Sequence, residues 1–317
     1  MLTSVEICAG AGGQALGLEK AGFSHQALVE IEPEYCATLK HNRPEWNVIQ
    51  KDVREFSGLG YRDIDLLAGG VPCPPFSKAG KQLGADDERD LFPEIIRLAY
   101  EIRPSAILIE NVKGLLDPVF NDYREHIKSE LAFAGYRGNW YLSNASDFGV
   151  PQLRPRVTFV AIRKSIGIEY EHPGKSAETP TVGEALYDLM RENDWDDVDN
   201  WKAKASKIAP TIVGGSKKHG GPDLGPTRAR KAWAELGVDG SGIAKEAPQK
   251  NFVGMPKLTN RMVARLQGFD DDWEFIGSKT CVYRQIGNAF PTPVAQSIGG
   301  AIRDCLTGSG IGFKSAV

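Results

Sequence analysis

The stretch Val5-Glu-Ile-Cys-Ala-Gly-Ala-Gly-Gly-Gln-Ala-Leu-Gly-Leu-Glu-Lys-Ala-Gly22 predicts a strand, a glycine-rich turn and a helix. Residues 5–8 form a short apolar run, and residues 15–22 follow a helical pattern that ends at Gly22. The glycines of Gly10-x-Gly12-x-x-Ala15 allow a tight turn and close ligand approach, and Glu30 follows Gly10 by twenty residues. This spacing predicts a site for an adenosine-type ligand, although a tight turn without a ligand also fits it.

The first 160 residues continue this alternation of apolar runs and helical patterns. Further strands are expected at residues 27–31, 48–50, 64–68, 105–109 and 157–162, and helices at residues 33–41, 91–102 and 123–134. Such alternation predicts an α/β fold with a doubly wound, mostly parallel sheet, which binds ligands beyond the carboxyl ends of its strands. Glu30, Asp52 and Glu110 follow three of these strands. Their carboxylates suit the ribose and adenine of S-adenosylmethionine better than a pyrophosphate.

Composition limits the remaining possibilities. The 317 residues are 41% hydrophobic and 25% charged, which is typical of a globular chain, and the apolar runs are too short for a membrane span. The first residues show no secretory pattern, with no basic segment before an apolar one. The five cysteines contain no C-x-x-C pair and the histidines no H-x-x-x-H spacing. We therefore expect a cytoplasmic protein without disulfides or a metal.

The net charge of −3 hides a local imbalance in the second half of the chain. Residues 202–231 hold eight Lys or Arg against one acid, whereas residues 184–199 hold seven acids against one Arg. This asymmetry predicts a surface that faces a polyanion, or else an ordinary solvated face. Residues 164–257 are rich in Gly, Pro, Lys and Asp with weak periodicity, which indicates an inserted or second domain.

Four residues could carry chemistry: Cys73, Glu110, Arg154 and Arg156. Cys73 lies in Gly69-Gly-Val-Pro-Cys-Pro-Pro-Phe-Ser77, where three prolines exclude a helix and would hold a nucleophilic sulfur in one place. Glu110 follows the most apolar strand expected, where a carboxyl tends to stay protonated. Arg154 and Arg156 lie two residues apart, so extended backbone would put both guanidinium groups on one face. A core thiol, a helix cap and surface ion pairs are the alternative interpretations.

Six separated segments occur in an order that resembles the DNA cytosine-C5 methyltransferase family. They are Ala9-Gly-Ala-Gly-Gly13, Pro72-Cys73, Glu110-Asn-Val112, Gln152-x-Arg154-x-Arg156, Leu258-Thr-x-Arg261 with Arg265-Leu-Gln-Gly-Phe269, and Gln285-Ile-Gly-Asn-Ala289. The resemblance covers roughly residues 1–163 and 256–303. It implies a Rossmann-like catalytic domain that methylates cytosine in a short specific sequence of double-stranded DNA, with a smaller inserted target-recognition domain.

The resemblance also implies roles for individual residues. Cys73 would add to C6 of a flipped-out cytosine, protonated Glu110 would bind N3 and the exocyclic amine, and Arg156 would hold O2, with Arg154 supporting the pocket or a phosphate. The residues that would bind S-adenosyl-L-methionine, and S-adenosyl-L-homocysteine as product, are Cys8, Ala9, Gly10, Ala11, Gly12, Gly13, Glu30, Ile31, Asp52, Val53, Pro72, Leu91, Asn288 and Ala289. Those that would contact DNA are Ser77, Lys78, Lys81, Gln152, Lys217, Lys218, Arg228 and Arg230.

The implied division assigns residues 1–163 and 280–317 to the catalytic domain, residues 164–272 to target recognition and residues 273–279 to a hinge. We expect a monomer that contacts neither a membrane nor a metal, and that modifies DNA beside a cognate restriction endonuclease. Three positions depart from the family pattern: Cys8 replaces an aromatic residue, Pro74 a glutamine and Asp90 a glycine.

Other activities remain open at this point. One is methylation of cytosine in RNA such as tRNA, and another is transfer to an exocyclic amine of DNA. Cys73-Pro-Pro-Phe76 keeps the prolines and the aromatic residue of amino methyltransferases but has a nucleophile in place of their polar acceptor, which favours carbon chemistry. A nicotinamide oxidoreductase would need a hydride-transfer site, and the sequence shows no His and Asp pair for one. A DNA-binding module without catalytic activity would not need Cys73 together with Glu110.

Overall fold

The computed structural model describes residues 1–72, 90–175, 177–216 and 221–309. It divides into two compact units. The first unit contains residues 1–143, 155–174 and 294–317, and the second contains residues 144–154 and 175–293. The predicted functional domains have other boundaries, since they assign residues 280–293 to the catalytic domain; that functional division stays a prediction.

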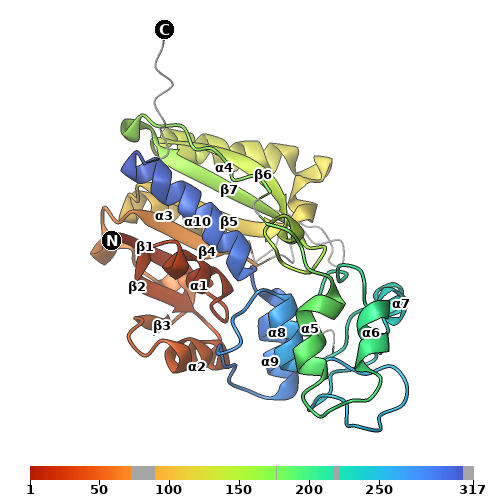
Figure 1. Ribbon diagram of the computed structural model, residues 1–317. Coiled ribbons are helices and arrows are strands. Elements are labelled where there is room, and N and C mark those ends of the chain that lie inside the picture. The colour runs from red at the N-terminus through yellow and green to blue at the C-terminus, as the bar shows by residue number, and fades with distance from the viewer. Residues whose placement is uncertain (73–89, 176, 217–220, 310–317) are drawn as a thin grey trace. The chain divides into compact units, whose positions relative to one another are not determined.

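A seven-stranded sheet forms the centre of the first unit (Figure 1). Its strands are β1 (Leu2–Ile7), β2 (Phe23–Glu30), β3 (Val48–Gln50), β4 (Leu66–Gly70), β5 (Ala106–Val112), β6 (Tyr136–Asn144) and β7 (Pro155–Arg163), in the order β3-β2-β1-β4-β5-β7-β6. The pairs among β1 to β5 are parallel, and β7 pairs with β5 in antiparallel orientation. The predicted α/β fold with a mostly parallel sheet is confirmed, whereas β6 was not predicted.

Helices cover both faces of this sheet, which explains why its central strands are apolar. The α-helices of the first unit are α1 (Gly13–Lys20), α2 (Pro33–Asn42), α3 (Phe92–Ile102), α4 (Asn121–Phe133) and α10 (Thr292–Thr307). Ile107 and Ile109 of β5 pack into one core with Phe92 and Ile95 of α3 and Ile127 of α4. Figure 1 shows α10 across the opposite face of the sheet, beside α1.

Close packing fixes α10 against α1. A Cβ atom on Gly299 would lie 2.8 Å from Leu18 Cδ2 and 2.9 Å from Ala21 Cβ, so only glycine allows this approach. Arg303 Nη1 also donates a hydrogen bond to the carbonyl of Ala21, at 3.0 Å. The short 3-10 segments are η1 (Val53–Glu55), η2 (Leu59–Tyr61), η4 (Lys113–Leu116), η5 (Pro118–Phe120), η6 (Ala145–Asp147) and η7 (Lys164–Ile166).

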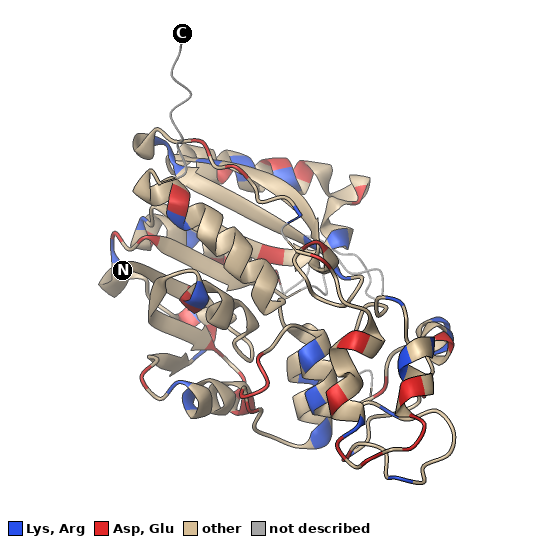
Figure 2. Ribbon diagram, viewed as in Figure 1, with Lys and Arg blue, Asp and Glu red and all other residues tan. Residues whose placement is uncertain are grey.

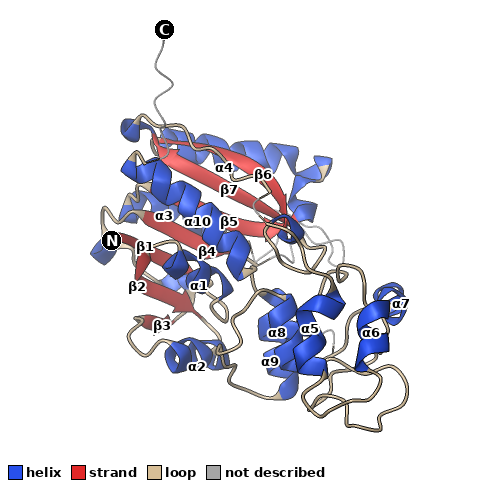
Figure 3. Cartoon of the chain, in the orientation of Figure 1, coloured by secondary structure: helices blue, strands red, loops and turns tan. Residues whose placement is uncertain are grey.

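The second unit contains helices joined by long loops (Figure 3). They are α5 (Val182–Met190), α6 (Val198–Lys204), α7 (Thr227–Glu235), α8 (Asn260–Leu266) and α9 (Lys279–Asn288). A capping box between Thr181 and Glu184 begins α5. Arg265 of α8 donates to the carbonyl of Ala185 at 3.1 Å and pairs with Asp188, so it ties α8 to α5.

Within the described residues, no helix combines the length and the apolar character that crossing a membrane requires. The same part of the chain contains no group of three His, Cys, Asp or Glu side chains placed to hold a metal ion.

A histidine in the first unit holds the segment after β7 against β6. His172 Nε2 lies 2.8 Å from the hydroxyl oxygen of Ser143, and Nδ1 lies 3.1 Å from that of Tyr170. The imidazole stacks on the ring of Tyr141, with centroids 4.4 Å apart. Burial lowers the pKa of His172 to about 4, so the ring stays neutral in the folded protein at neutral pH.

We expect the free energy of unfolding to decrease as the pH falls from about 6.5 toward about 4, because the unfolded chain then binds a proton that folded His172 does not. Chemical denaturation across this range measures the slope. His172→Gln removes the titrating ring and should flatten the curve, whereas His126→Gln, at an exposed position on α4, should not. Equal slopes in the parent and His172→Gln would contradict this interpretation.

Candidate active site

The carboxyl ends of the parallel strands bring several predicted residues to one edge of the sheet. Cys8 to Gly13 follow β1, Glu30 ends β2, Asp52 follows β3, and Pro72 follows β4. Glu110 lies in β5, directly opposite Gly70 of β4. Since β1, β2, β3, β4 and β5 are all parallel, these positions share one edge, where α/β sheets bind ligands.

The glycine loop after β1 has three residues with left-handed backbone: Cys8 at φ +52°, Gly10 at +58° and Gly12 at +93°. The two glycines adopt this conformation without strain, whereas Cys8 does so at a cost. A Cβ atom on Gly10 would meet nothing within 4 Å, so the loop has open space at this point. Burial raises the pKa of the Cys8 thiol far above its ordinary value, so Cys8 is not a thiolate nucleophile.

Glu30 holds this loop in place. Its Oε2 accepts a hydrogen bond from the backbone N–H of Gly10 at 2.7 Å, and its Oε1 accepts one from the N–H of Glu32 at 2.8 Å. The side chain is buried, and desolvation raises the pKa of Glu30 despite these hydrogen bonds. Each carboxylate oxygen has a further lone pair, so Glu30 can still accept a bond from a ligand hydroxyl.

The other predicted cofactor residues near this loop differ in exposure. Ile31 is 55% exposed and presents an apolar surface directly after Glu30. Val53 and Leu91 are buried in the core of the first unit. Asp52 begins η1: its Oδ1 accepts a hydrogen bond from Arg54 N at 2.9 Å, and its Oδ2 lies 3.2 Å from Arg54 Nη1.

Glu110 and Arg156 form an ion pair, with 2.8 Å between Arg156 Nε and Glu110 Oε1. Their side chains are only 8% and 13% exposed, respectively. The antiparallel pairing of β5 and β7 brings them together, because Thr158 lies opposite Glu110 and Arg156 opposite Val112. A guanidinium at this distance favours the carboxylate form of Glu110. The protonated form of Glu110 that the resemblance implies stays a prediction.

Arg154 has different surroundings from Arg156. Arg154 is 0% exposed. Nη1 donates to the carbonyl of Ile212 at 2.6 Å, and Nη2 donates to those of Gly287 at 2.8 Å and Ala289 at 3.0 Å. These bonds join three segments of the chain, so the local geometry indicates a structural role. Contact with a base or a phosphate would require the guanidinium to leave them.

Gln152 is another buried side chain of the second unit that joins separate segments of the chain by hydrogen bonds. Its Nε2 donates to the carbonyl of Leu266 and to Gln267 Oε1, and its Oε1 accepts from the N–H of Ile212. The residue is 0% exposed, so the predicted contact with DNA would require these bonds to break. By contrast, Arg228 and Arg230 are exposed on α7.

The predicted cofactor residues near the end of α9 belong to the second unit. Asn288 is exposed, and its Nδ2 donates to the carbonyl of Gly215 at 3.2 Å. The carbonyl of Ala289 accepts bonds from Arg154 and from Gln267. Contacts of Asn288 and Ala289 with a cofactor stay predictions.

Several predicted residues lie outside the described part of the chain: Cys73, Pro74, Ser77, Lys78, Lys81, Lys217 and Lys218. Asp90, one of the departures from the family pattern, is described. Its Oδ1 accepts a hydrogen bond from Phe92 N at 3.0 Å, and its Oδ2 accepts one from the hydroxyl of Tyr123. Asp90 therefore ties the start of α3 to α4.

The sequence did not predict a role for two buried side chains on the face of the sheet that carries Glu110. Gln14, in the first turn of α1, and Thr158, opposite Glu110, each have a polar atom with no hydrogen-bond partner among the described residues. The sequence holds a weak signal for Gln14, which directly follows the glycine cluster. The cross-strand position of Thr158 depends on β7 running antiparallel to β5.

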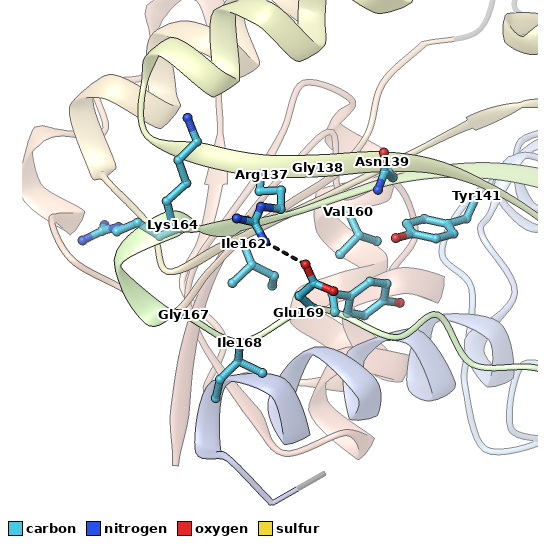
Figure 4. A pocket seen from close by; sticks show the side chains of 12 residues that line it. Arg137, Gly138, Asn139, Tyr141, Val160, Ile162, Lys164, Gly167, Ile168 and Glu169 are labelled. Atoms are coloured by element: carbon cyan, nitrogen blue, oxygen red, sulfur yellow. Dashed lines mark hydrogen bonds and ion pairs between the residues drawn. The ribbon is translucent and has the colours of Figure 1, made fainter. Parts of the chain in front are cut away.

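A pocket elsewhere on the first unit is a poorer candidate (Figure 4). It is lined by residues from the start of β6, the end of β7 and the segment that follows β7, with Arg137 Nη1 paired to Glu169 Oε1 at 2.9 Å. Ile162 pairs with Ala106, the first residue of β5. The pocket therefore lies near the amino end of β5, whereas Glu110 lies near the carboxyl end of that strand.

Comparisons with known proteins agree on one family. The family model described as C-5 cytosine-specific DNA methylase matches residues 2–304. The chain is 59% identical over 308 residues to Type II methyltransferase M.NgoMIV of Neisseria gonorrhoeae, covering 96% of this chain and 98% of the relative. It is 55% identical over 322 residues to Type II methyltransferase M.NaeI of Lentzea aerocolonigenes, covering 100% of this chain and 78% of the relative.

Solved structures show the same fold at low sequence identity. A mutant of Spodoptera frugiperda DNMT2 matches with a TM-score of 0.68 at 18% identity, covering 96% of this chain and 100% of that chain. The S. pombe Dnmt2 methyltransferase matches with a TM-score of 0.62 at 18% identity, covering 98% and 99%.

Arg154→Met should lower the free energy of unfolding of the second unit by about 2–5 kcal/mol, because three buried carbonyls lose their charged donor. Denaturant titration measures this change. The matched control is Arg228→Met at an exposed position, which we expect to change stability by less than about 0.5 kcal/mol. If Arg154→Met were as stable as this control, the structural role of Arg154 would be refuted.

Proposed function

The chain belongs to the C-5 cytosine-specific DNA methylase family, and from this premise we propose how its own residues act on cytosine. It is a DNA (cytosine-5-)-methyltransferase whose methyl donor is S-adenosyl-L-methionine. The observation that carries the assignment of roles is the ion pair of Glu110 with Arg156, at the same sheet edge as the glycine loop.

The residues after β1, β2 and β3 fit the methyl donor. The open space at Gly10 admits a ligand close to the backbone, and Ile31 offers an exposed apolar surface for a flat ring. Glu30 would accept bonds from ribose hydroxyls and Asp52 from the adenine amine, as carboxylates at these two strand ends can. When bound, the donor supplies an electrophilic methyl group on a sulfonium.

We assign the covalent step to Cys73. Its thiolate adds to C6 of cytosine, the S–C6 bond forms, and the electron pair of the C5–C6 double bond moves to C5. C5 would then attack the methyl carbon as the bond from that carbon to the sulfonium sulfur breaks, and S-adenosyl-L-homocysteine would leave with that electron pair. A base, such as water, then removes the C5 proton. The electron pair of that C–H bond restores the C5–C6 double bond, the S–C6 bond breaks, and Cys73 leaves as a thiolate.

Glu110 and Arg156 would bind the base during this sequence. In its protonated form Glu110 donates to N3 and accepts from the exocyclic amine, while Arg156 donates to the O2 carbonyl. Their ion pair holds both side chains in place before the base arrives. Neither C5 nor C6 can be reached inside a duplex, so the cytosine has to be flipped out of the helix.

The second unit supplies the proposed recognition surface. Figure 2 shows Lys and Arg positions along the ribbon of α7. Arg228, Arg230 and Lys231 are exposed there. We assign residues 164–272 to target recognition, residues 273–279 to a hinge, and residues 1–163 with 280–317 to catalysis. Both curated relatives described above are named Type II methyltransferases. On that likeness we propose a monomeric cytoplasmic enzyme that protects DNA from a cognate restriction endonuclease.

Cys73→Ser should lower methyl transfer to duplex DNA by several orders of magnitude and leave cofactor binding intact, because serine is a far weaker nucleophile at neutral pH. Transfer of a labelled methyl group to duplex DNA and to tRNA measures the activity, and bisulfite sequencing locates the product. Cys281→Ser, at a half-buried thiol on α9, is the control and should stay active. Transfer to tRNA alone would overturn the DNA assignment.

Oligonucleotides that contain 5-fluorocytosine test the covalent step directly. Fluorine at C5 cannot be removed as a proton, so the protein should stay joined to the DNA through residue 73 when the methyl donor is present. An adduct at another side chain, or no adduct with an enzyme that methylates normal DNA, would exclude this mechanism.

The slope of log affinity against log salt is negative, and each phosphate contact contributes roughly 0.9 to its magnitude. Replacing both Arg228 and Arg230 with Gln should therefore reduce the magnitude of this slope by about 2. Equilibrium binding to cognate duplex at several salt concentrations measures this slope. Arg191→Gln, at an exposed position next to the acidic stretch, serves as the control and should leave the slope unchanged. An unchanged slope in the double variant would show that α7 faces solvent.

A further inference from the structure

Gln14 and Glu110 face the same small space above Gly70 in the first unit. A Cβ atom on Gly70 would lie 3.4 Å from Glu110 Oε2 and 3.9 Å from Gln14 Oε1. Gly70 is also the direct partner of Glu110 across β4 and β5. The absence of a side chain at Gly70 therefore leaves room between the Gln14 amide and the Glu110 carboxyl.

The amide of Gln14 is buried and incompletely bonded. The residue is 4% exposed, and its Nε2 has no hydrogen-bond partner among the described residues. A buried amide donor without a partner is unfavourable, and a water molecule or a functional partner can supply the missing bond. Glu110 Oε1 is engaged by Arg156, and Oε2 is the oxygen on the side of Gly70.

Resting on the proposed function, we propose that Gln14 is a positioning residue that hydrogen-bonds Glu110 Oε2 and supports both protonation states of that carboxyl during the reaction.

The chemistry of an amide makes Gln14 suitable for this role. Turning the amide by half a rotation exchanges its donor for its acceptor. With Nε2 toward Glu110, Gln14 donates to the carboxylate; with Oε1 toward Glu110, it accepts the proton of the carboxylic acid. Arg156 can only donate, so it stabilises the carboxylate alone. Gln14 would thus accept the proton of Glu110 until N3 of cytosine replaces Gln14 as its acceptor.

Two other buried polar groups lie on the same face of the sheet as Glu110. Thr158 lies opposite Glu110 in β7, and its hydroxyl has no partner among the described residues. Glu6 of β1 points to the same face and is 0% exposed. Burial, reinforced by the nearby Glu30, holds the pKa of Glu6 well above its ordinary value. Arg156 is a charged group that contacts Glu110, with 2.8 Å between Arg156 Nε and Glu110 Oε1.

Two variants of Gln14 test the proposal. Gln14→Met keeps the length of the side chain but cannot hydrogen-bond, so the single-turnover methylation rate should fall about tenfold while affinity for S-adenosyl-L-homocysteine is unchanged. Gln14→Glu adds a negative charge beside Glu110, so the alkaline limb of the pH–rate profile should move upward by about one pH unit. Leu18→Met, which alters apolar packing on the same helix, should match the parent in both measurements.

A double-mutant cycle separates this proposal from the proposed function. If Gln14 acts through Glu110, Gln14→Met should cause no further loss of rate in a Glu110→Gln background. A tenfold loss in both backgrounds would overturn the role of Gln14 and leave that of Glu110 intact. A fully active Glu110→Gln enzyme would instead overturn the proposed function. Parental rates for Gln14→Met across the pH range would also refute the positioning role of Gln14. If Gln14→Glu does not fold, the rates of Gln14→Met alone test that role.

Discussion

Parallel hydrogen bonding among β1, β2, β3, β4 and β5 is the constraint on which the proposed site depends. Since each of these strands ends at the same edge, the glycine loop, Glu30, Asp52 and Glu110 are collected there from positions far apart in the chain. The antiparallel strand β7 then contributes Arg156 to that edge. A register shift of one residue in β7 would turn Arg156 to the other face of the sheet and separate it from Glu110.

The two neighbouring arginines Arg154 and Arg156 are both largely buried, but they have different partners. Arg156 forms an ion pair with a carboxylate at the sheet edge, and its buried Nε has no hydrogen-bond partner among the described residues. Arg154, two residues earlier, donates to three backbone carbonyls in the second unit and is wholly enclosed. Removing either partner of such an interaction leaves a buried group unsatisfied, which costs more than the intact interaction contributes. Arg156 is therefore the better candidate for chemistry, and Arg154 for stability.

The glycine loop combines backbone strain with a specific restraint. Left-handed backbone at Cys8, Gly10 and Gly12 turns the chain sharply after β1, and the buried carboxylate of Glu30 fixes the N–H of Gly10. Gln14 follows immediately on α1, so one short segment connects the proposed donor site with the partner proposed for Glu110. A loop held in this way needs little further ordering when a ligand binds.

The alternation of strands and helices and the glycine loop could be predicted from sequence, because local periodicity and turn residues express them directly. Motif order likewise indicated the family that the comparisons show. Sequence did not reveal β6, the enclosure of Arg154 and Gln152, or the position of Gln14 beside Glu110. Those features depend on which strands pair and in which direction. Strand pairing joins residues far apart in the chain, so only the tertiary structure decided them.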